Sequence, residues 1–274
     1  MQLSPAEQLM YSTVRIECKN NLGQSSVGTG FHFRFKISES VFAPVIITNK
    51  HVVSNMTFAQ IVVCHADENG NPIDNKHFEI HFANLSNSII YHPDPSVDLC
   101  AISTGQAFNH FDNEKIKVFT IFLDETIIPT IEQLKELNAV EDILMVGYPN
   151  GLWDNFNNKP IFRRGSTATH PAMDYRGIKE FVIDAACFPG SSGSPVLIFN
   201  TNSYSPKNGG LNMGARVYLL GLLYAGPQYT ASGEIQVIDV PTVKQPISNT
   251  QLMLNLGYVI KAERILELRS VMFI

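Results

Sequence analysis

The sequence contains no cluster of basic residues, and charged residues of either sign are scarce. Lys and Arg number 20, Asp and Glu number 25, and together they make up 16% of the 274 residues. Proteins that bind nucleic acid usually gather Lys and Arg on one surface. Because the formal net charge is −5 and no run of basic residues occurs, the chain is not expected to bind DNA or RNA.

A secretory leader and a membrane span are also missing from the printed sequence. A secretory signal needs a basic start followed by about 7–15 apolar residues, and the opening MQLSPAEQ has neither. No window reaches the roughly 18 apolar residues that a spanning helix requires. We therefore expect a soluble, cytoplasmic protein that has no membrane partner.

Cysteine is sparse, and its spacing gives no metal-binding motif. The four cysteines are Cys18, Cys64, Cys100 and Cys187, and none stands in a C-x-x-C pair. A zinc site is therefore not expected. The first three lie inside apolar runs, and we interpret them as buried thiols rather than disulfides, in keeping with a reducing compartment.

The sequence does contain many short apolar or alternating runs, separated by Gly, Pro, Asn and Asp. Short strands with frequent turn residues are typical of a sandwich or a barrel, so we expect an all-β fold. The expected strands are residues 12–18, 45–48, 60–64, 79–82, 99–102, 143–146, 181–183, 195–198, 218–223 and 257–260.

Signals for other elements are few. Residues 130–137 and 261–269 have the composition of short helices. Residues 67–72 (DENGNP) predict a hairpin turn, and residues 201–214 predict a surface loop. The best candidate for a boundary between two strand-rich halves lies within residues 120–140.

Three local patterns carry residues that can do chemistry together. His51 directly follows an apolar run (IITNKHVV), Asp98 opens another (DLCAI), and Ser192 lies between glycines (GSSGSP). A serine hydroxyl is a poor nucleophile until a neighbouring imidazole takes its proton. A buried carboxylate fixes the imidazole tautomer and stabilises the imidazolium. These residue types together indicate a Ser192–His51–Asp98 catalytic triad.

The glycines beside the serine have a separate task. Gly190 can adopt a backbone conformation that residues with a Cβ avoid. The N–H groups of Gly190 and Ser192 can then point at one spot and stabilise a tetrahedral oxyanion.

The order of these patterns resembles the chymotrypsin-like (trypsin-like) serine peptidases, and most of all their bacterial branch with HtrA-type protease domains. The resemblance implies two antiparallel six-stranded β-barrels with a short C-terminal helix. Residues 1–125 would form the first barrel, with His51 and Asp98, and residues 126–274 the second, with Ser192. It implies a serine endopeptidase that acts on protein or peptide substrates through an acyl-enzyme and without a cofactor. No PDZ domain is expected in the remaining length.

The resemblance also assigns the pocket for the residue that precedes the scissile bond. Its walls would be Ala186, Cys187, Phe188, Tyr224, Ala225 and Gly226. Because no carboxylate falls at the base of this pocket, a preference for Lys or Arg is not expected. We expect a small or medium apolar residue there, such as Val, Ala, Leu or Thr.

One departure from the family concerns control of activity. Digestive members carry Asp just before the nucleophile, where this chain has Ser191, and they begin with an Ile-Val-Gly-Gly motif that is absent here. Activation by cleavage of the N-terminus is therefore not expected. We expect another form of control: a regulatory protein partner, an inhibitor, or an oxyanion loop that orders on binding.

Several alternatives stay open at this point. Asp94 is a competing carboxylate, and Ser191 and Ser194 are competing nucleophiles. The Arg163–Arg164 pair is interpreted as a solvated pair or loop anchor, with the binding of an acidic substrate or regulator as the less favoured reading. The chain as a whole could instead be a protein-binding module with a dormant peptidase site, or an esterase with the same triad.

Overall fold

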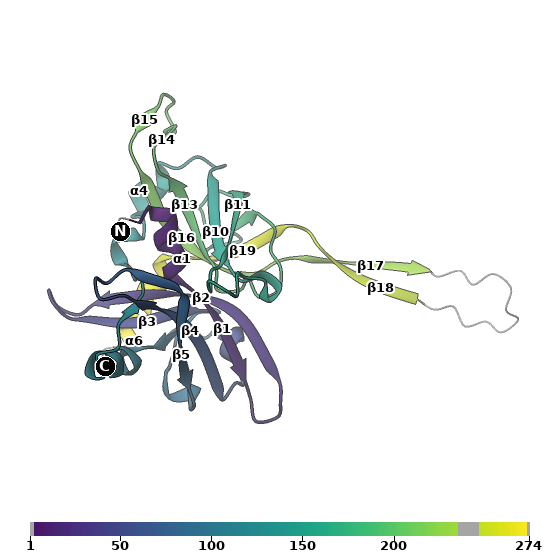
Figure 1. Cartoon of the computed structure of the whole chain (residues 1–274). Coiled ribbons are helices and arrows are strands. Elements are labelled where there is room, and N and C mark those ends of the chain that lie inside the picture. Colours follow the sequence, from purple (N-terminus) through teal and green to yellow (C-terminus); the bar gives the residue numbers. More distant parts are fainter. Residues whose placement is uncertain (1–2, 235–246, 273–274) are drawn as a thin grey trace, which may run out of the picture.

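The computed structural model describes residues 3–234 and 247–272, and its strands form two main halves (Figure 1). The first half is a nine-stranded sheet whose main path runs β5-β4-β1-β2-β3-β7-β6, while β8 pairs with β4 and β9 with β2. Its strands are β1 (Thr13–Lys19), β2 (Ser25–Lys36), β3 (Phe42–Thr48), β4 (Phe58–Ala66), β5 (Pro72–Phe82), β6 (Ile89–Tyr91), β7 (Cys100–Ser103), β8 (Val118–Phe119) and β9 (Leu123–Asp124).

The second half is a closed barrel of six antiparallel strands in the order β10-β11-β12-β19-β16-β13. Its strands are β10 (Asp142–Gly147), β11 (Ile161–Thr167), β12 (Glu180–Asp184), β13 (Pro195–Asn200), β16 (Arg216–Ala225) and β19 (Leu256–Lys261). Two hairpins stand apart from the main sheets in Figure 1. They are β14 (Ser203–Tyr204) with β15 (Asn212–Met213), and β17 (Gln228–Glu234) with β18 (Ile247–Met253).

The helices are short. They are α1 (Pro5–Ser12), α2 (Lys50–Val53), α3 (Gly105–Asn113), α4 (Ile131–Lys135), α5 (Glu263–Glu267) and α6 (Arg269–Met272), with 3₁₀ turns η1 (Leu85–Asn87), η2 (Glu125–Ile127) and η3 (Pro149–Gly151). No helix in the described ranges is both long and apolar enough to cross a membrane.

The expected all-β architecture and the six-stranded second barrel are confirmed, but the first half forms a nine-stranded sheet instead of the expected six-stranded barrel. Its sheet ends at β5 on one side and β6 on the other. Helix α3 contributes Phe111 and Phe108 to the same apolar cluster as Ile80 and Phe82 of β5. Helix α3 and the edge strand β5 therefore share part of one apolar core.

Local chemistry accounts for the helix starts and the turn. Thr130 caps α4 through a capping box with Gln133, which confirms the helix expected at residues 130–137. The turn expected at residues 67–72 joins β4 to β5, and Asp67 accepts hydrogen bonds from the backbone of Asn69 and Asn71. All four cysteines are free and buried, as expected for the first three.

A shared core joins the two halves and places the site between them. Alternate residues of β3 face opposite ways, so Ile46 packs inside the first sheet while Val45 and Ile47 face the second half. We call this shared cluster the junction core. It contains Leu9, Phe31, Phe33, Phe35, Val45, Ile47, Leu99 and Ala101 with Leu144, Val146, Leu197, Leu219, Leu222, Ile260, Ile265 and Leu268.

The C-terminal helix expected at residues 261–269 is present as α5 and α6, but it also reaches the first half rather than docking on the second alone. Arg269 donates to the carbonyl of Lys36 and to Glu125, and Arg264 pairs with Asp94. Figure 1 shows α6 beside the strands of the first half. The helix therefore ties the end of the chain to the loop that leads to Asp98.

A buried histidine on β2 predicts a pH dependence of stability. His32 is 1% exposed, and burial lowers its pKa from 6.5 to about 3. The unfolded chain takes up a proton below pH 6.5 that the folded chain accepts only near pH 3. As the pH is lowered from 6.5 to about 3, the free energy of unfolding should therefore fall by about 1.4 kcal/mol per pH unit. Urea unfolding at a series of pH values should give a shallower slope for His32→Phe, and an unchanged slope would contradict this assignment.

Candidate active site

His51 and Asp98 are brought together by two adjacent strands. His51 lies on α2, directly after β3, and Asp98 precedes β7, which pairs with β3. The Asp98 carboxylate accepts from the His51 backbone N–H through Oδ1 at 3.0 Å and lies 2.5 Å from imidazole Nδ1 through Oδ2. Since Nδ1 is held by the carboxylate, Nε2 is the nitrogen left to meet a substrate or a nucleophile.

The surroundings keep the Asp98 carboxyl ionised. Burial raises its pKa, but the hydrogen bond and the charge of His51 outweigh burial, so the net pKa lies below 3.8. The side-chain amide of Asn49 donates to the Asp98 carbonyl at 2.8 Å and fixes the loop. The competing carboxylate, Asp94, pairs instead with Arg264 at 2.8 Å.

The serine loop of the second half packs directly against the strands that carry His51. The Ser192 carbonyl accepts from the backbone N–H of Thr29 on β2 at 2.8 Å, and Gly193 donates to the Leu223 carbonyl at 2.7 Å. Gly193 also lies against Thr48, which is three residues before His51. In the described part of the chain no hydrogen bond joins the Ser192 hydroxyl to His51, and such contacts often tighten only when substrate binds.

The two competing serines are enclosed. Ser191 is 1% exposed and Ser194 is 0% exposed, and neither hydroxyl has a hydrogen-bond partner within the described residues. Ser192 is only half-buried. Because a nucleophile must touch the substrate, accessibility favours Ser192 among the three.

The backbone before Ser192 contains the two N–H groups that the sequence predicts as oxyanion donors. The Pro189 carbonyl accepts from the Asn150 N–H at 2.5 Å, and Gly190 has φ +86°. In a trans peptide the carbonyl and the following N–H point in opposite directions, so the Gly190 N–H faces away from Asn150. Across residues 3–234 and 247–272, the N–H groups of Gly190 and Ser192 meet no backbone acceptor, which leaves both available to an oxyanion.

Substitution of Gly193 is expected to destabilise the folded protein strongly. Its φ is +87°, and an added Cβ would overlap the Thr29 carbonyl oxygen and lie 2.8 Å from Thr48 Oγ1. We expect Gly193→Ala to lower the free energy of unfolding by at least about 3 kcal/mol, since strain and overlap both apply. Gly210→Ala is the matched control, because Gly210 has φ +91° but open space around it. Equal losses in urea unfolding would show that the close packing of Gly193 does not matter.

Of the expected pocket residues, Cys187 is the one whose surroundings are most defined. It is 5% exposed, and an added Cβ at Gly226 would lie 3.6 Å from its Cβ. An added Cβ at Gly257 would lie 2.6 Å from its Sγ. Burial raises the pKa of the thiol to about 11, so it is protonated at neutral pH. Cys187 therefore fills space between two glycines.

The other expected wall residues have contacts of their own. The carbonyl of Ala186 accepts a hydrogen bond from Arg163, whose guanidinium lies over the Phe188 ring. Tyr224 and Ala225 end strand β16, where its pairing with β19 is irregular, and the Tyr224 hydroxyl donates to Glu180 at 2.9 Å.

Several residues of this site did not emerge from the sequence. Thr29 donates hydrogen bonds to the carbonyls of Ser192 and Gly190, and Thr48 donates to the carbonyl of Thr29. Asn150 holds the Pro189 carbonyl, and Gly257 faces Cys187. A signal was present for Gly257, because a glycine inside a strand often marks close approach of another group. For Asn150 the signals were its place in a Pro-Asn-Gly turn and the resemblance of residues 147–151 to a loop of HtrA-type protease domains.

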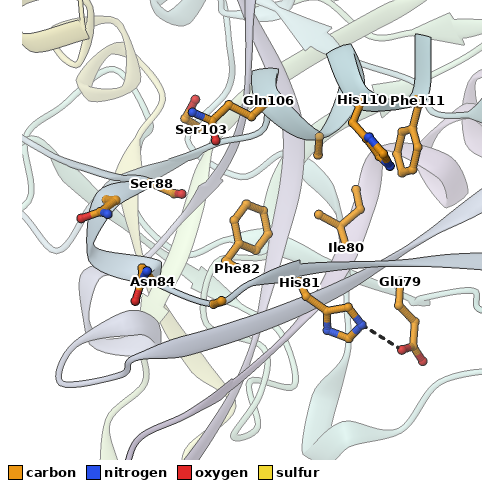
Figure 2. Close-up of a pocket in the computed structure, with 13 residues that line it drawn as sticks. Glu79, Ile80, His81, Phe82, Asn84, Ser88, Ser103, Gln106, His110 and Phe111 are labelled. Carbon is orange, nitrogen blue, oxygen red and sulfur yellow. Dashed lines mark ion pairs between the residues drawn. The ribbon is translucent and has the colours of Figure 1, made fainter. Parts of the chain in front are cut away.

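A separate cavity of about 540 Å³ lies between β5 and α3 (Figure 2). Ile80 and Phe82 point into it, and His81 pairs with Glu79 at 3.2 Å on its rim. It contains none of the residues expected in the active site. Among the described residues, no serine hydroxyl there is hydrogen-bonded to a histidine, so it lacks a paired nucleophile and base.

Comparison with known proteins identifies a family and solved structures that are similar to this chain. A family model described as a trypsin-like peptidase domain matches residues 28–203. No curated protein matches the sequence. A solved structure titled "HtrA-type protease AlgW with tripeptide" is similar, with 16% identity and a TM-score of 0.47. The match covers 96% of this chain and 60% of that one, so the chain spans about three fifths of that relative's length.

Proposed function

The chain belongs to the trypsin-like peptidase family, and from this premise we propose that it is a serine endopeptidase with Ser192, His51 and Asp98 as its triad. Ser192 attacks the substrate carbonyl carbon, and His51 Nε2 accepts the hydroxyl proton. His51 then gives that proton to the leaving amine as the peptide bond breaks, which leaves an acyl-enzyme. A water molecule, activated by His51 in the same way, releases the acid product.

One observation carries this proposal: the loop of the accessible Ser192 packs on Thr29 of β2, and β2 pairs with β3, the strand that leads to the His51–Asp98 pair. Asp98 stays ionised and stabilises the imidazolium that forms during attack. The N–H groups of Gly190 and Ser192 would hold the oxyanion. No step in this sequence calls for a metal or an organic cofactor.

We further propose that the pocket accepts a small or medium apolar residue before the scissile bond. The position of Cys187 between Gly226 and Gly257 supports a shallow pocket. Cys187→Gly should deepen it, and should raise kcat/KM for Leu or Phe relative to Ala by about tenfold or more, since one or two buried methylenes are worth that much. Fluorogenic peptides that differ only at this residue measure the ratio. An unchanged ratio, or strong selectivity for Lys or Arg in the wild type, would overturn the pocket assignment.

The control of the enzyme and its location are also proposals. The hydrogen bond between Asn150 and Pro189 favours control by a protein partner or an inhibitor over an oxyanion loop that must first order. The four free, buried thiols are in keeping with a reducing, cytoplasmic environment. If the purified chain cleaves unfolded proteins at full rate with nothing added, the regulatory proposal is wrong.

The endopeptidase proposal is tested by digestion of an unfolded protein and a peptide library, with the new termini mapped by mass spectrometry. EDTA in the buffer suppresses metallopeptidase contaminants. We expect internal cleavage after small or medium apolar residues. A protein-binding module with a dormant site would leave every substrate intact, and an esterase would hydrolyse ester substrates but not peptides.

A further inference from the structure

Arg163 contacts the wall of the predicted pocket from outside the triad. It lies on β11, opposite Met145 of β10, and its guanidinium Nη1 donates a hydrogen bond to the carbonyl of Ala186. The guanidinium also lies over the Phe188 ring, 4.7 Å from the ring centroid. One planar side chain thus holds a backbone carbonyl and an aromatic ring that are two residues apart.

The segment held in this way leads directly to the oxyanion donors. Residues 186–188 are followed by Pro189, whose carbonyl accepts from Asn150, and then by Gly190. Asn150 belongs to the connection between β10 and β11, and Arg163 belongs to β11 itself. The β10–β11 hairpin therefore holds the segment near both of its ends, by a side chain at the start and by a backbone N–H close to Gly190.

The neighbouring arginine does not share these contacts. Successive residues of a strand point to opposite faces, and Arg164 lines an outer surface with Phe162 and Gly165, on the side where Ala6 of α1 lies. Arg164 is exposed, whereas Arg163 is half-buried. The pair therefore divides into one residue at the pocket wall and one at the surface, and Arg164 supplies a matched control.

We propose that Arg163 is a positioning residue, which fixes the segment 186–188 so that the N–H of Gly190 is aimed at the developing oxyanion. This inference rests on the proposed function of Ser192 and its oxyanion donors. An arginine suits the task better than a lysine, because only a planar guanidinium both stacks on a ring and donates in a fixed direction.

The test compares Arg163→Met with Arg164→Met in the full chain. Met keeps much of the length of the side chain but has neither charge nor donors. For Arg163→Met we expect kcat to fall by about ten- to a hundredfold with KM changed less than about threefold, because a misdirected oxyanion donor weakens the transition state more than the bound substrate. Arg164→Met should keep both constants near those of the wild type.

A second readout separates positioning from a general structural role. A peptide boronate forms a tetrahedral adduct on the nucleophile and places an oxygen where the oxyanion forms. Its inhibition constant should rise in Arg163→Met by the same factor by which kcat/KM falls, while the melting temperature stays close to that of Arg164→Met. Unchanged kcat and boronate affinity in a folded Arg163→Met protein would overturn the proposal, as would equal losses in Arg164→Met.

Two further variants decide the question if Arg163→Met does not fold. Arg163→Lys keeps the charge and a donor but cannot stack as a plane, so kcat should fall by an intermediate, about three- to tenfold factor. Phe188→Leu removes the ring, and adding it to Arg163→Lys should lower kcat by less than the product of the two single effects. If the effects of Arg163→Lys and Phe188→Leu on kcat simply multiplied, the two side chains would not act together, and the proposal would be contradicted. If Ser192→Ala stays active, the proposed function fails whatever Arg163 does, so the two failures are distinguishable.

Discussion

Replacement of Ser192 by alanine is expected to lower kcat for peptide hydrolysis by about 10⁵- to 10⁶-fold, since loss of the nucleophile removes nearly all the work of a triad. The residual rate would come from substrate binding and from the N–H donors of Gly190 and Ser192, which the substitution leaves in place. Steady-state assays with a fluorogenic peptide measure the loss, at enzyme concentrations high enough to detect the residual activity of the variant.

The neighbouring serines provide the controls for that result. Ser191→Ala and Ser194→Ala each remove a buried hydroxyl that has no partner among the described residues. We expect both variants to fold and to keep hydrolytic activity within about tenfold of the wild type, because neither hydroxyl reaches the substrate. A loss of the size expected for Ser192 in one of these variants, with Ser192→Ala still active, would move the nucleophile to that residue.

Substitution of Asp98 by asparagine is expected to lower kcat by about 10⁴-fold, the loss typical of this change in a triad. The carboxylate binds both the backbone N–H and the Nδ1 of His51. An amide has no charge to stabilise the imidazolium, and its NH₂ group favours the tautomer in which Nδ1 is the acceptor. Nε2 then carries a proton and cannot act as the base.

A control for the Asp98 variant is available in the same loop. Asp94→Asn removes the competing carboxylate, which pairs with Arg264 and accepts from Ser96. We expect a loss of stability that is visible in urea unfolding, with kcat reduced by less than about tenfold. If Asp94→Asn lost activity as Asp98→Asn is expected to, and Asp98→Asn did not, the carboxylate would have been assigned to the wrong residue.

Short-range patterns were enough to predict most strands and the residues of the candidate site. Each expected apolar run became part of a strand, because alternation and turn residues are encoded locally. His51, Asp98 and Ser192 stood out because each follows or opens such a run. These patterns do not show that the three residues lie close together in the folded chain, and their proximity was inferred only through the resemblance to a family.

Among the elements that escaped prediction, two depend on distant contacts and a third does not. Helix α3 has no side-chain N-cap and a poor helical composition, and Phe108 and Phe111 stabilise it by packing on β5. The ladder of β17 with β18 joins segments on either side of residues 235–246. The exception is α1, where Ser4, Pro5 and Glu7 form a capping box that was readable from the sequence.

The open first sheet and the docking of the C-terminal helix could not be predicted either, because both depend on contacts between residues that are distant in the sequence. Closure depends on whether β5 and β6 meet, which is decided by the register of every strand between them. The apolar residues Ile265 and Leu268 indicated that the helix has a buried face, but any apolar surface would have satisfied that pattern. In the structure, its ion pairs with Asp94 and Glu125 join it to the first half.

The most direct measurement is the structure of the covalent adduct with a fluorophosphonate. The account predicts that phosphorus is bonded to Oγ of Ser192. The phosphoryl oxygen should lie within hydrogen-bonding distance of the backbone N–H groups of Gly190 and Ser192, and the imidazole of His51 should lie next to the position that the leaving group occupied. An adduct on another serine, or a side chain at 51 turned away from the phosphorus with its carboxylate contact broken, would contradict it.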